Sequence, residues 1–288
     1  MQTEVPISLV MLLLVGGSLS AETVAESQRV EANRVAEVAL VSDTAYEQPF
    51  VELELTAIVA QPDGRDLRVP AFWAGGNRWC FRYASPVSGR HTWKTECSDH
   101  GNPKLHGVTG TIEVFPYRGE NPLFLHEPIR VAEDKRHFEH VDGTPFFWLG
   151  DTWWKGLCNR IPWEGFQTLT ADRKAKGYTV VQTIGGGPYP DEPLFDPRWG
   201  NEGGMPYEID LASINPAYLA QADRRIAHLI DAGIMPAIVD TWSFHNPGRV
   251  SNLTLGKDSI LRHWCYLIAR YGAYPVSWIV AGEMIEPE

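Results

Sequence analysis

The sequence predicts two folded parts, an antiparallel β-sandwich of immunoglobulin or fibronectin type followed by the first half of a (β/α)8 barrel of the TIM type. Residues 29–117 contain short runs that alternate apolar and polar side chains, separated by Gly, Pro and Asn turn signals. This pattern is typical of strands at hairpin spacing. From residue 146 onward, short apolar runs alternate with stretches of helical periodicity. That alternation predicts right-handed βαβ units and a parallel sheet.

The composition is that of a soluble globular protein. The chain has 288 residues, of which 44% are hydrophobic and 21% charged, enough for one large domain or two ordinary ones. The net charge of -11 argues against nucleic acids and anionic membranes as partners, because both are bound through an excess of Lys and Arg.

Residues 1–21 have the character of an export signal. An apolar core, Ile7–Val15, is followed by small residues that suit cleavage, and it is too short to span a membrane. The segment before this core is atypical, since it contains Glu4 and neither Lys nor Arg. We therefore expect a secreted or periplasmic protein, with no membrane contact beyond export.

The cysteines allow two interpretations. In an exported chain, Cys80 and Cys97 could form a disulfide between neighbouring strands of the sandwich, and buried free thiols are an equal alternative. The spacing of these two with Cys158 and Cys265 fits no zinc site. We expect neither a metal nor another cofactor.

The first part, residues 29–117, offers no chemistry of its own. We expect Trp79 and Trp93 to fill its core in preference to binding sugar, and the domain to act as a structural module. Residues 118–145 are then expected to form a linker and a lead-in hairpin that ends at the turn Asp142-Gly143. The strands predicted for the sandwich cover residues 51–59, 67–73, 79–83, 91–95 and 110–115.

The second part, residues 146–288, is expected to hold four βα units. Each predicted helix ends at a glycine, and Asn215-Pro216 supplies an N-cap and a first helical residue. No Gly-x-Gly-x-x-Gly motif follows the first strand, so a dinucleotide-binding sheet is disfavoured. The predicted strands cover residues 146–150, 178–183, 234–239 and 276–281, with the first and last buried, and the predicted helices cover 163–176, 215–232 and 258–271.

Acidic and aromatic residues gather where these strands end. In a barrel, the carboxyl ends of the strands carry the chemistry, and carboxylates beside indole rings suit glycoside hydrolysis. We expect Glu283 to be the general acid/base, although a strand-end Glu that pairs with Arg or meets solvent is the plainer alternative. The residues expected to bind substrate are Asp151, Trp153, Trp154, Gln182, Asp240, Trp242 and His245. For the two Asp residues the alternative is a loop-bridging role, and for the Trp residues it is core packing.

The barrel part resembles the apiosidase-like glycoside hydrolases, a (β/α)8 family that often carries an N-terminal sandwich domain of unknown function. The resemblance lies in Asp142–Trp154 (DGTPFFWLGDTWW), Ile209–Leu211, Asn215–Tyr218 and Trp278–Glu283, and in the sandwich in residues 69–73, 79–83 and 88–93. It implies hydrolysis of O-glycosyl bonds in plant-type, pectin-like polysaccharides or oligosaccharides, with carbohydrate as the partner.

The resemblance departs from the family at the proposed acid/base. The fourth strand of the family commonly ends in Gly-Gly-Asp, whereas this sequence has Ala281-Gly282-Glu283. The role transfers to Glu283 with a longer side chain, which alters the separation between the two catalytic carboxyl groups.

The sequence stops after four of the eight expected βα units. The second catalytic carboxylate of such barrels usually comes from a late strand, so we expect the chain as given to be an inactive fragment. We also expect its open sheet edge to favour poor solubility or pairing with another copy. The alternatives are a non-catalytic exported glycan-binding protein and a metal-dependent hydrolase that uses His245 and Asp240.

Overall fold

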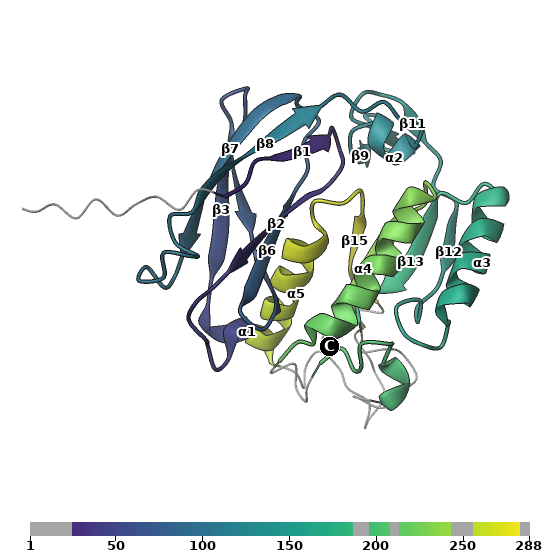
Figure 1. Cartoon of the computed structure of the whole chain (residues 1–288). Helices are drawn as coiled ribbons and strands as arrows, with labels where there is room; N and C mark the ends of the chain where they lie inside the picture. The colour runs from purple at the N-terminus through teal and green to yellow at the C-terminus, as the bar shows by residue number, and fades with distance from the viewer. Residues whose placement is uncertain (1–24, 187–195, 208–212, 243–255, 283–288) are drawn as a thin grey trace, which may run out of the picture.

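The computed structural model describes residues 25–186, 196–207, 213–242 and 256–282. A β-sandwich and an α/β unit lie side by side, with two helices of the α/β unit against the sandwich (Figure 1). The predicted export signal, residues 1–21, lies outside the described residues. Within the described part of the chain, no helix is both long enough and apolar enough to cross a membrane.

The sandwich consists of a five-stranded sheet in the order β1-β8-β7-β3-β4 and a three-stranded sheet in the order β2-β6-β5. Alternate residues of β7 point into the core between the sheets, where Trp93 packs edge-on against Phe81 of β6 at 5.1 Å. Both predicted core tryptophans, Trp79 and Trp93, are buried here. The strands are β1 (Gln28–Glu31), β2 (Ala36–Val41), β3 (Leu55–Ala60), β4 (Asp66–Pro70), β5 (Phe72–Gly75), β6 (Arg78–Tyr83), β7 (Gly89–Cys97) and β8 (Thr109–Phe115).

Three details of this domain differ from the sequence prediction. β1 pairs with β8 in parallel, so the sandwich is not purely antiparallel. The run at 51–59 begins as a short helix, α1 (Pro49–Glu52), because Pro49 suits a first helical turn. The run at 67–73 is shared by two strands in different sheets, β4 and β5, because the chain crosses the sandwich at Ala71.

The cysteines are free thiols in the structure. Cys80 lies on β6 and Cys97 on β7, in opposite sheets, and both are buried without a disulfide. The disulfide alternative is therefore wrong, and the free-thiol alternative holds. Burial raises the pKa of both thiols, which keeps them protonated.

A linker with helix α2 (Pro122–Leu125) leads into a small antiparallel sheet and then into the parallel sheet. The Asp142-Gly143 turn is present, and Gly143 has a positive φ of 87°. The small sheet has strands β9 (Ile129–Val131), β10 (Phe138–His140) and β11 (Pro145–Phe146).

The parallel sheet has the strand order β12-β13-β14-β15, which is the order of the chain. The predicted alternation of strands and helices is confirmed. Pro236 lies near the start of β14, before the pairing with β15 begins at Ala237, so its missing N–H removes no bond to that neighbour. The elements are β12 (Gly150–Thr152), α3 (Trp163–Ala175), β13 (Val180–Ile184), the 3-10 turn η1 (Pro197–Trp199), α4 (Pro216–Asp231), β14 (Met235–Trp242), α5 (Lys257–Tyr271) and β15 (Ser277–Gly282).

Two predicted buried strands are less buried than expected. In the run at 146–150, Phe146 pairs with Phe138 in the small sheet, Phe147 is 73% exposed, and the parallel strand begins only at Gly150. In β15, Val280 is 67% exposed, because β15 is an edge strand of the described sheet. An apolar run in a sequence does not distinguish a central strand from an edge strand.

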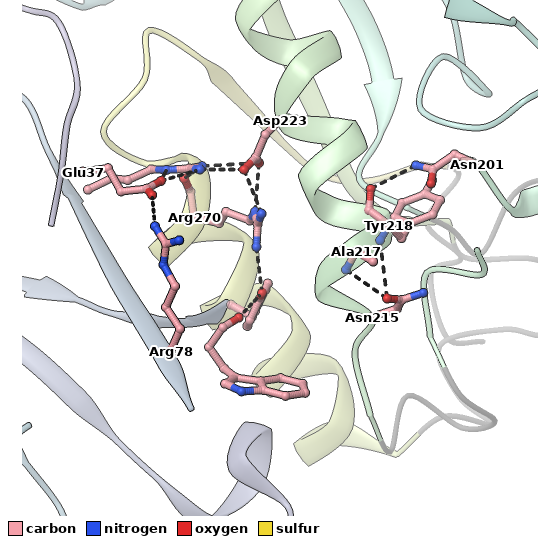
Figure 2. A network of polar contacts seen from close by, with 11 residues as sticks. Glu37, Arg78, Asn201, Asn215, Ala217, Tyr218, Asp223 and Arg270 are labelled. Atoms are coloured by element: carbon pink, nitrogen blue, oxygen red, sulfur yellow. Dashed lines mark hydrogen bonds and ion pairs between the residues drawn. The ribbon is translucent and has the colours of Figure 1, made fainter. Parts of the chain in front are cut away.

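A buried ionic network joins the sandwich to the α/β unit (Figure 2). Arg82 of β6 donates to Asp223 of α4 at 2.6 Å and to the carbonyl of Arg270 of α5 at 2.8 Å. Arg270 donates two hydrogen bonds to the same carboxylate, at 2.8 and 2.7 Å. Glu37 of β2 pairs with Arg82 at 2.9 Å, so the two buried guanidinium groups face two carboxylates.

Candidate functional site at the carboxyl ends of the parallel strands

The loops that follow the carboxyl ends of the parallel strands form one rim. We call the loop after β12, residues 153–161, rim loop A, and the described segment between β13 and α4, residues 196–207, rim loop B. Asn159 of loop A donates its backbone N–H to Gly200 of loop B at 2.9 Å. The Asn201 amide donates to the carbonyls of Leu157 and Tyr218, at 3.1 and 3.0 Å. The two loops therefore form one bonded unit.

The N-terminus of α4 holds rim loop B. Asn215 accepts hydrogen bonds from the backbone N–H groups of Ala217 and Tyr218, which confirms the predicted N-cap. Its amide nitrogen donates to the carbonyls of Gly203 and Met205, at 2.9 and 2.7 Å (Figure 2 shows Asn215, Asn201 and Tyr218). Gly203 lies so close to Ala217 that a Cβ there would collide with the Ala217 carbonyl. Only glycine fits this approach of loop and helix.

Arg225 of α4 holds rim loop A. Its side chain is buried, and its guanidinium donates to the carbonyls of Gly156 and Ile161 at 2.9 and 2.7 Å. Glu202 of loop B lies 3.3 Å from the same guanidinium. One buried cation thus satisfies backbone groups of loop A and pairs with a carboxylate of loop B.

Replacing Arg225 by Met is expected to lower the free energy of unfolding by about 1.5–3 kcal/mol, the range for hydrogen bonds to a charged group. Urea unfolding would measure this loss. The matched control is Arg224→Met, because Arg224 is exposed and its guanidinium lies over the Trp163 ring at 3.8 Å. Equal losses in the two variants would contradict the assigned role of Arg225.

A pocket of about 490 Å³ lies between the rim loops. Apart from Pro197 and two glycines, the described lining residues carry cations, carboxamides and one thioether, from Lys155, Asn159, Arg160, Arg198, Asn201 and Met205. Beside it, hydrogen bonds from Arg198 lower the pKa of Asp196 to about 2. The described lining of the pocket therefore offers hydrogen-bond donors, and it includes no carboxylate.

The carboxylate of Asp151 is engaged by protein groups. In the sheet register Asp151 pairs with Val181, whose side chain packs on Phe166 of α3, so Asp151 faces the helices. It accepts hydrogen bonds from the Trp153 indole at 2.8 Å and from Arg173 of α3 at 2.5 Å. Burial raises its pKa, but these bonds outweigh burial and the net pKa is lowered. The donors are two side chains and the N–H of the adjacent Thr152, so they differ from the predicted bridging of loops through backbone N–H groups. The role of Asp151 in binding substrate stays a prediction, and a lowered pKa does not suit a general acid.

The two neighbouring tryptophans have different surroundings. Trp153 is 6% exposed and packs edge-on against Phe166 at 5.3 Å, between the sheet and the helices. Trp154 is half-buried and packs with Ile184 and Val239, on the face of the sheet opposite to α3. Gln182 is half-buried, and the sheet register places it on the same face as Ile184. Of the described residues predicted to bind substrate, the structure therefore brings Trp154 and Gln182 to the face opposite to α3.

The remaining predicted residues lie at the edge of the described chain. Asp240 and Trp242 belong to β14, but their side chains are outside the described part, as are Glu283 and His245. Trp242 pairs with Gly282, the last residue of β15. Glu283 is the next residue in the sequence. Among the described side chains, no three of the His, Cys, Asp or Glu type are placed to share a metal ion.

Comparison with known families assigns this two-part architecture. The family model for the catalytic domain of the apiosidase-like proteins matches residues 132–287. The chain belongs to the apiosidase-like family. Its sandwich, over residues 29–98, matches a domain of unknown function (DUF5060). No curated protein matches the chain.

One solved structure has a similar fold. A protein from Bacteroides vulgatus ATCC 8482, described provisionally as a glycoside hydrolase, has a TM-score of 0.69 at 23% identity. The match covers 89% of this chain and 50% of that protein, so the chain spans about half of its length. A family 5 glycoside hydrolase from the same organism gives a TM-score of 0.42 at 23% identity, over 54% of this chain and 33% of its own.

The structure adds site residues of this apiosidase-like chain that sequence reasoning missed. Asn201 and Arg225 hold the rim loops, and Lys155 and Arg198 line the pocket. Asn201 stands in a Gly-rich turn segment, where an amide side chain commonly bonds to backbone. Arg225 interrupts the apolar face of the α4 pattern, which is the one signal that could have marked it as buried.

Proposed function

We propose that this apiosidase-like protein hydrolyses O-glycosyl bonds of plant-type polysaccharides or oligosaccharides at the rim of its parallel sheet. The proposal rests on one observation: the described α-helices α3, α4 and α5 pack against the same face of the parallel sheet. Val181 packs on Phe166 of α3 and Leu229 of α4, and Ile238, on the same face, lies with Leu267 of α5 beside Gly185. In a doubly wound sheet the helices would cover both faces.

Helices on one face are what a (β/α)8 barrel requires, because the other face becomes the barrel interior. We therefore interpret β12–β15 and their helices as the first half of such a barrel. Trp154, Ile184, Trp199 and Val239 cluster on the face opposite to α3, α4 and α5. Active sites of barrel enzymes lie at the carboxyl ends of the strands, where rim loops A and B meet.

Glu283 is the proposed general acid/base. It follows Gly282 in the sequence, and Gly282 ends β15 and pairs with Trp242 at the end of β14. As the acid it would protonate the leaving glycosidic oxygen, while a second carboxylate acts as nucleophile or base. The test is release of reducing ends from a panel of plant polysaccharides. Absence of release from every substrate, by a folded form of the enzyme that carries both catalytic carboxylates, would overturn the proposal.

Substrate contacts are proposed for Trp154 and Gln182. They are also proposed for Asp240, Trp242 and His245, whose side chains lie outside the described part of the chain. Trp154→Ala is expected to weaken glycan binding several-fold, because the indole face is lost. Trp153→Phe keeps a ring in the core and is expected to leave binding unchanged. Affinity electrophoresis in gels that contain polysaccharide would compare the two. Equal weakening in both variants would exclude a separate role for Trp154.

A second candidate is glycan binding without hydrolysis. It is favoured by the rim pocket, whose described lining residues include cations and carboxamides and no carboxylate. Calorimetric binding to a polysaccharide that the protein leaves uncut would support this candidate. Secretion or periplasmic export also stays a proposal, and N-terminal sequencing of the exported protein for cleavage near residue 21 would test it.

A further inference from the structure

Helix α4 carries polar anchors on two sides. Asp223 points toward the sandwich, where it meets Arg82 and Arg270, whereas Asn215 and Arg225 bond to the rim loops. Figure 2 shows Asp223 and Arg270 on one side of α4, and Asn201 and Asn215 on the other. Asp223 and Arg225 are two residues apart, about 3 Å along the helix axis. The helix therefore links two sets of contacts that are far apart in the sequence.

The sandwich contacts α4 and α5 at several points. Gly75 of β5 lies against Pro216, the first residue of α4. The Tyr266 hydroxyl of α5 donates to the carbonyl of Trp73 at 2.6 Å. The Phe72 ring lies beneath both guanidinium groups of the network, 5.0 Å from Arg82 and 4.8 Å from Arg270. These contacts hold α4 and α5 against the sandwich, since buried charges hold their partners in one geometry.

The other side of α4 holds nearly every anchor described for the rim. Asn215 binds the carbonyls of Gly203 and Met205, and the Tyr218 carbonyl accepts from Asn201. Arg225 binds the carbonyls of loop A. Because a helix is stiff over two turns, a shift of α4 at Asp223 would move these anchors as well.

We propose that the sandwich domain positions the rim loops through α4, and that Arg82 is the positioning residue on the sandwich side. In this role the sandwich is part of the substrate site, although its residues 29–117 contribute no group to the rim pocket. The inference rests on the proposed function only in calling the rim the substrate site. The coupling itself depends on the contacts of α4. The contrasting arrangement is a sandwich that acts as an independent module.

Hydrogen exchange of the 288-residue protein tests the coupling. Arg82→Met removes the bonds to Asp223 and leaves that carboxylate paired with Arg270, so the variant is expected to fold. The backbone N–H groups of Asn159 and Gly204, both bonded within the rim, are expected to exchange several-fold faster than in the wild type. Arg82→Lys keeps the charge and is expected to restore most of the protection.

The matched control is Val59→Ala, which weakens the sandwich core at a residue whose core cluster includes no residue of α4. The rim N–H groups are expected to keep wild-type exchange in this variant. Unchanged rim exchange in folded Arg82→Met, or an equal increase in Val59→Ala, would overturn the proposal. If Arg82→Met does not fold, Glu37→Gln takes its place, because it removes the sandwich-side carboxylate that pairs with Arg82 and leaves Asp223 and Arg270 intact. Its rim N–H groups are expected to exchange faster than those of Val59→Ala, and equal exchange would overturn the proposal.

Glycan binding measured on the same variants separates the two proposals. Faster rim exchange together with weaker glycan binding in Arg82→Met would support both. Faster rim exchange in a protein that binds no glycan would refute the proposed substrate site and leave the coupling standing. Normal glycan binding with unchanged rim exchange would refute the coupling alone.

Discussion

Glu283→Gln is expected to lower glycoside hydrolysis by about 10²–10⁴-fold in any form of the enzyme with measurable turnover. The amide cannot donate a proton to the leaving oxygen, although it has nearly the shape of the acid. The loss should depend on the substrate. An aryl glycoside with a good leaving group needs little protonation, so it is expected to suffer less than a polysaccharide. Initial rates on both kinds of substrate would measure the difference.

The control is Glu286→Gln, the same change of acid to amide three residues further along. It is expected to keep the wild-type rate and pH profile. In Glu283→Gln, the alkaline limb of the bell-shaped pH profile should disappear, because that limb reports the acid. An unchanged rate in Glu283→Gln would remove Glu283 from the mechanism.

The elements of the α/β unit were predictable because their signals are local. Asn215-Pro216 marks the start of α4 and Gly233 its end, and both assignments need only neighbouring residues. The partial exposure of β15 was not predictable, because Val280 has the apolar character of a buried residue and lies at a sheet edge. Edge position is set by which strands pair, and that is a property of the whole chain.

The candidate site was predictable only in outline. Strand ends placed Asp151 at the rim, but the register with Val181 turns its carboxylate toward Arg173 of α3. Period-2 alternation relates residues within one strand and does not say which face the helices cover. The anchors of the rim lie far apart in sequence, as with Arg225 and Ile161, 64 residues apart. Such pairs leave no local signal.

Asp223→Ala is expected to lower the free energy of unfolding by about 3–5 kcal/mol, the cost of breaking a buried pair by removing one partner. The cost arises because two buried arginines lose the carboxylate that they share. Arg82 and Arg270 are each 5% exposed and would face each other with Glu37 as the nearest remaining carboxylate. Their guanidinium groups stay charged at every accessible pH, so they cannot relieve the repulsion by losing protons. Urea unfolding of both proteins at neutral pH would measure the loss.

Asp231→Ala is the matched control, since Asp231 ends the same helix and is exposed. Its effect should stay within about 0.5 kcal/mol. Burial raises the pKa of Asp223, but the bonds from Arg270 and Arg82 outweigh burial and the net pKa is lowered. The stabilisation is therefore complete above the unfolded pKa of about 3.9 and is lost as the pH falls through the folded value. Asp223→Asn should lack this part of the acid dependence. If it unfolds in acid with the same pH dependence as the wild type, the carboxylate is not what holds the sandwich to α4.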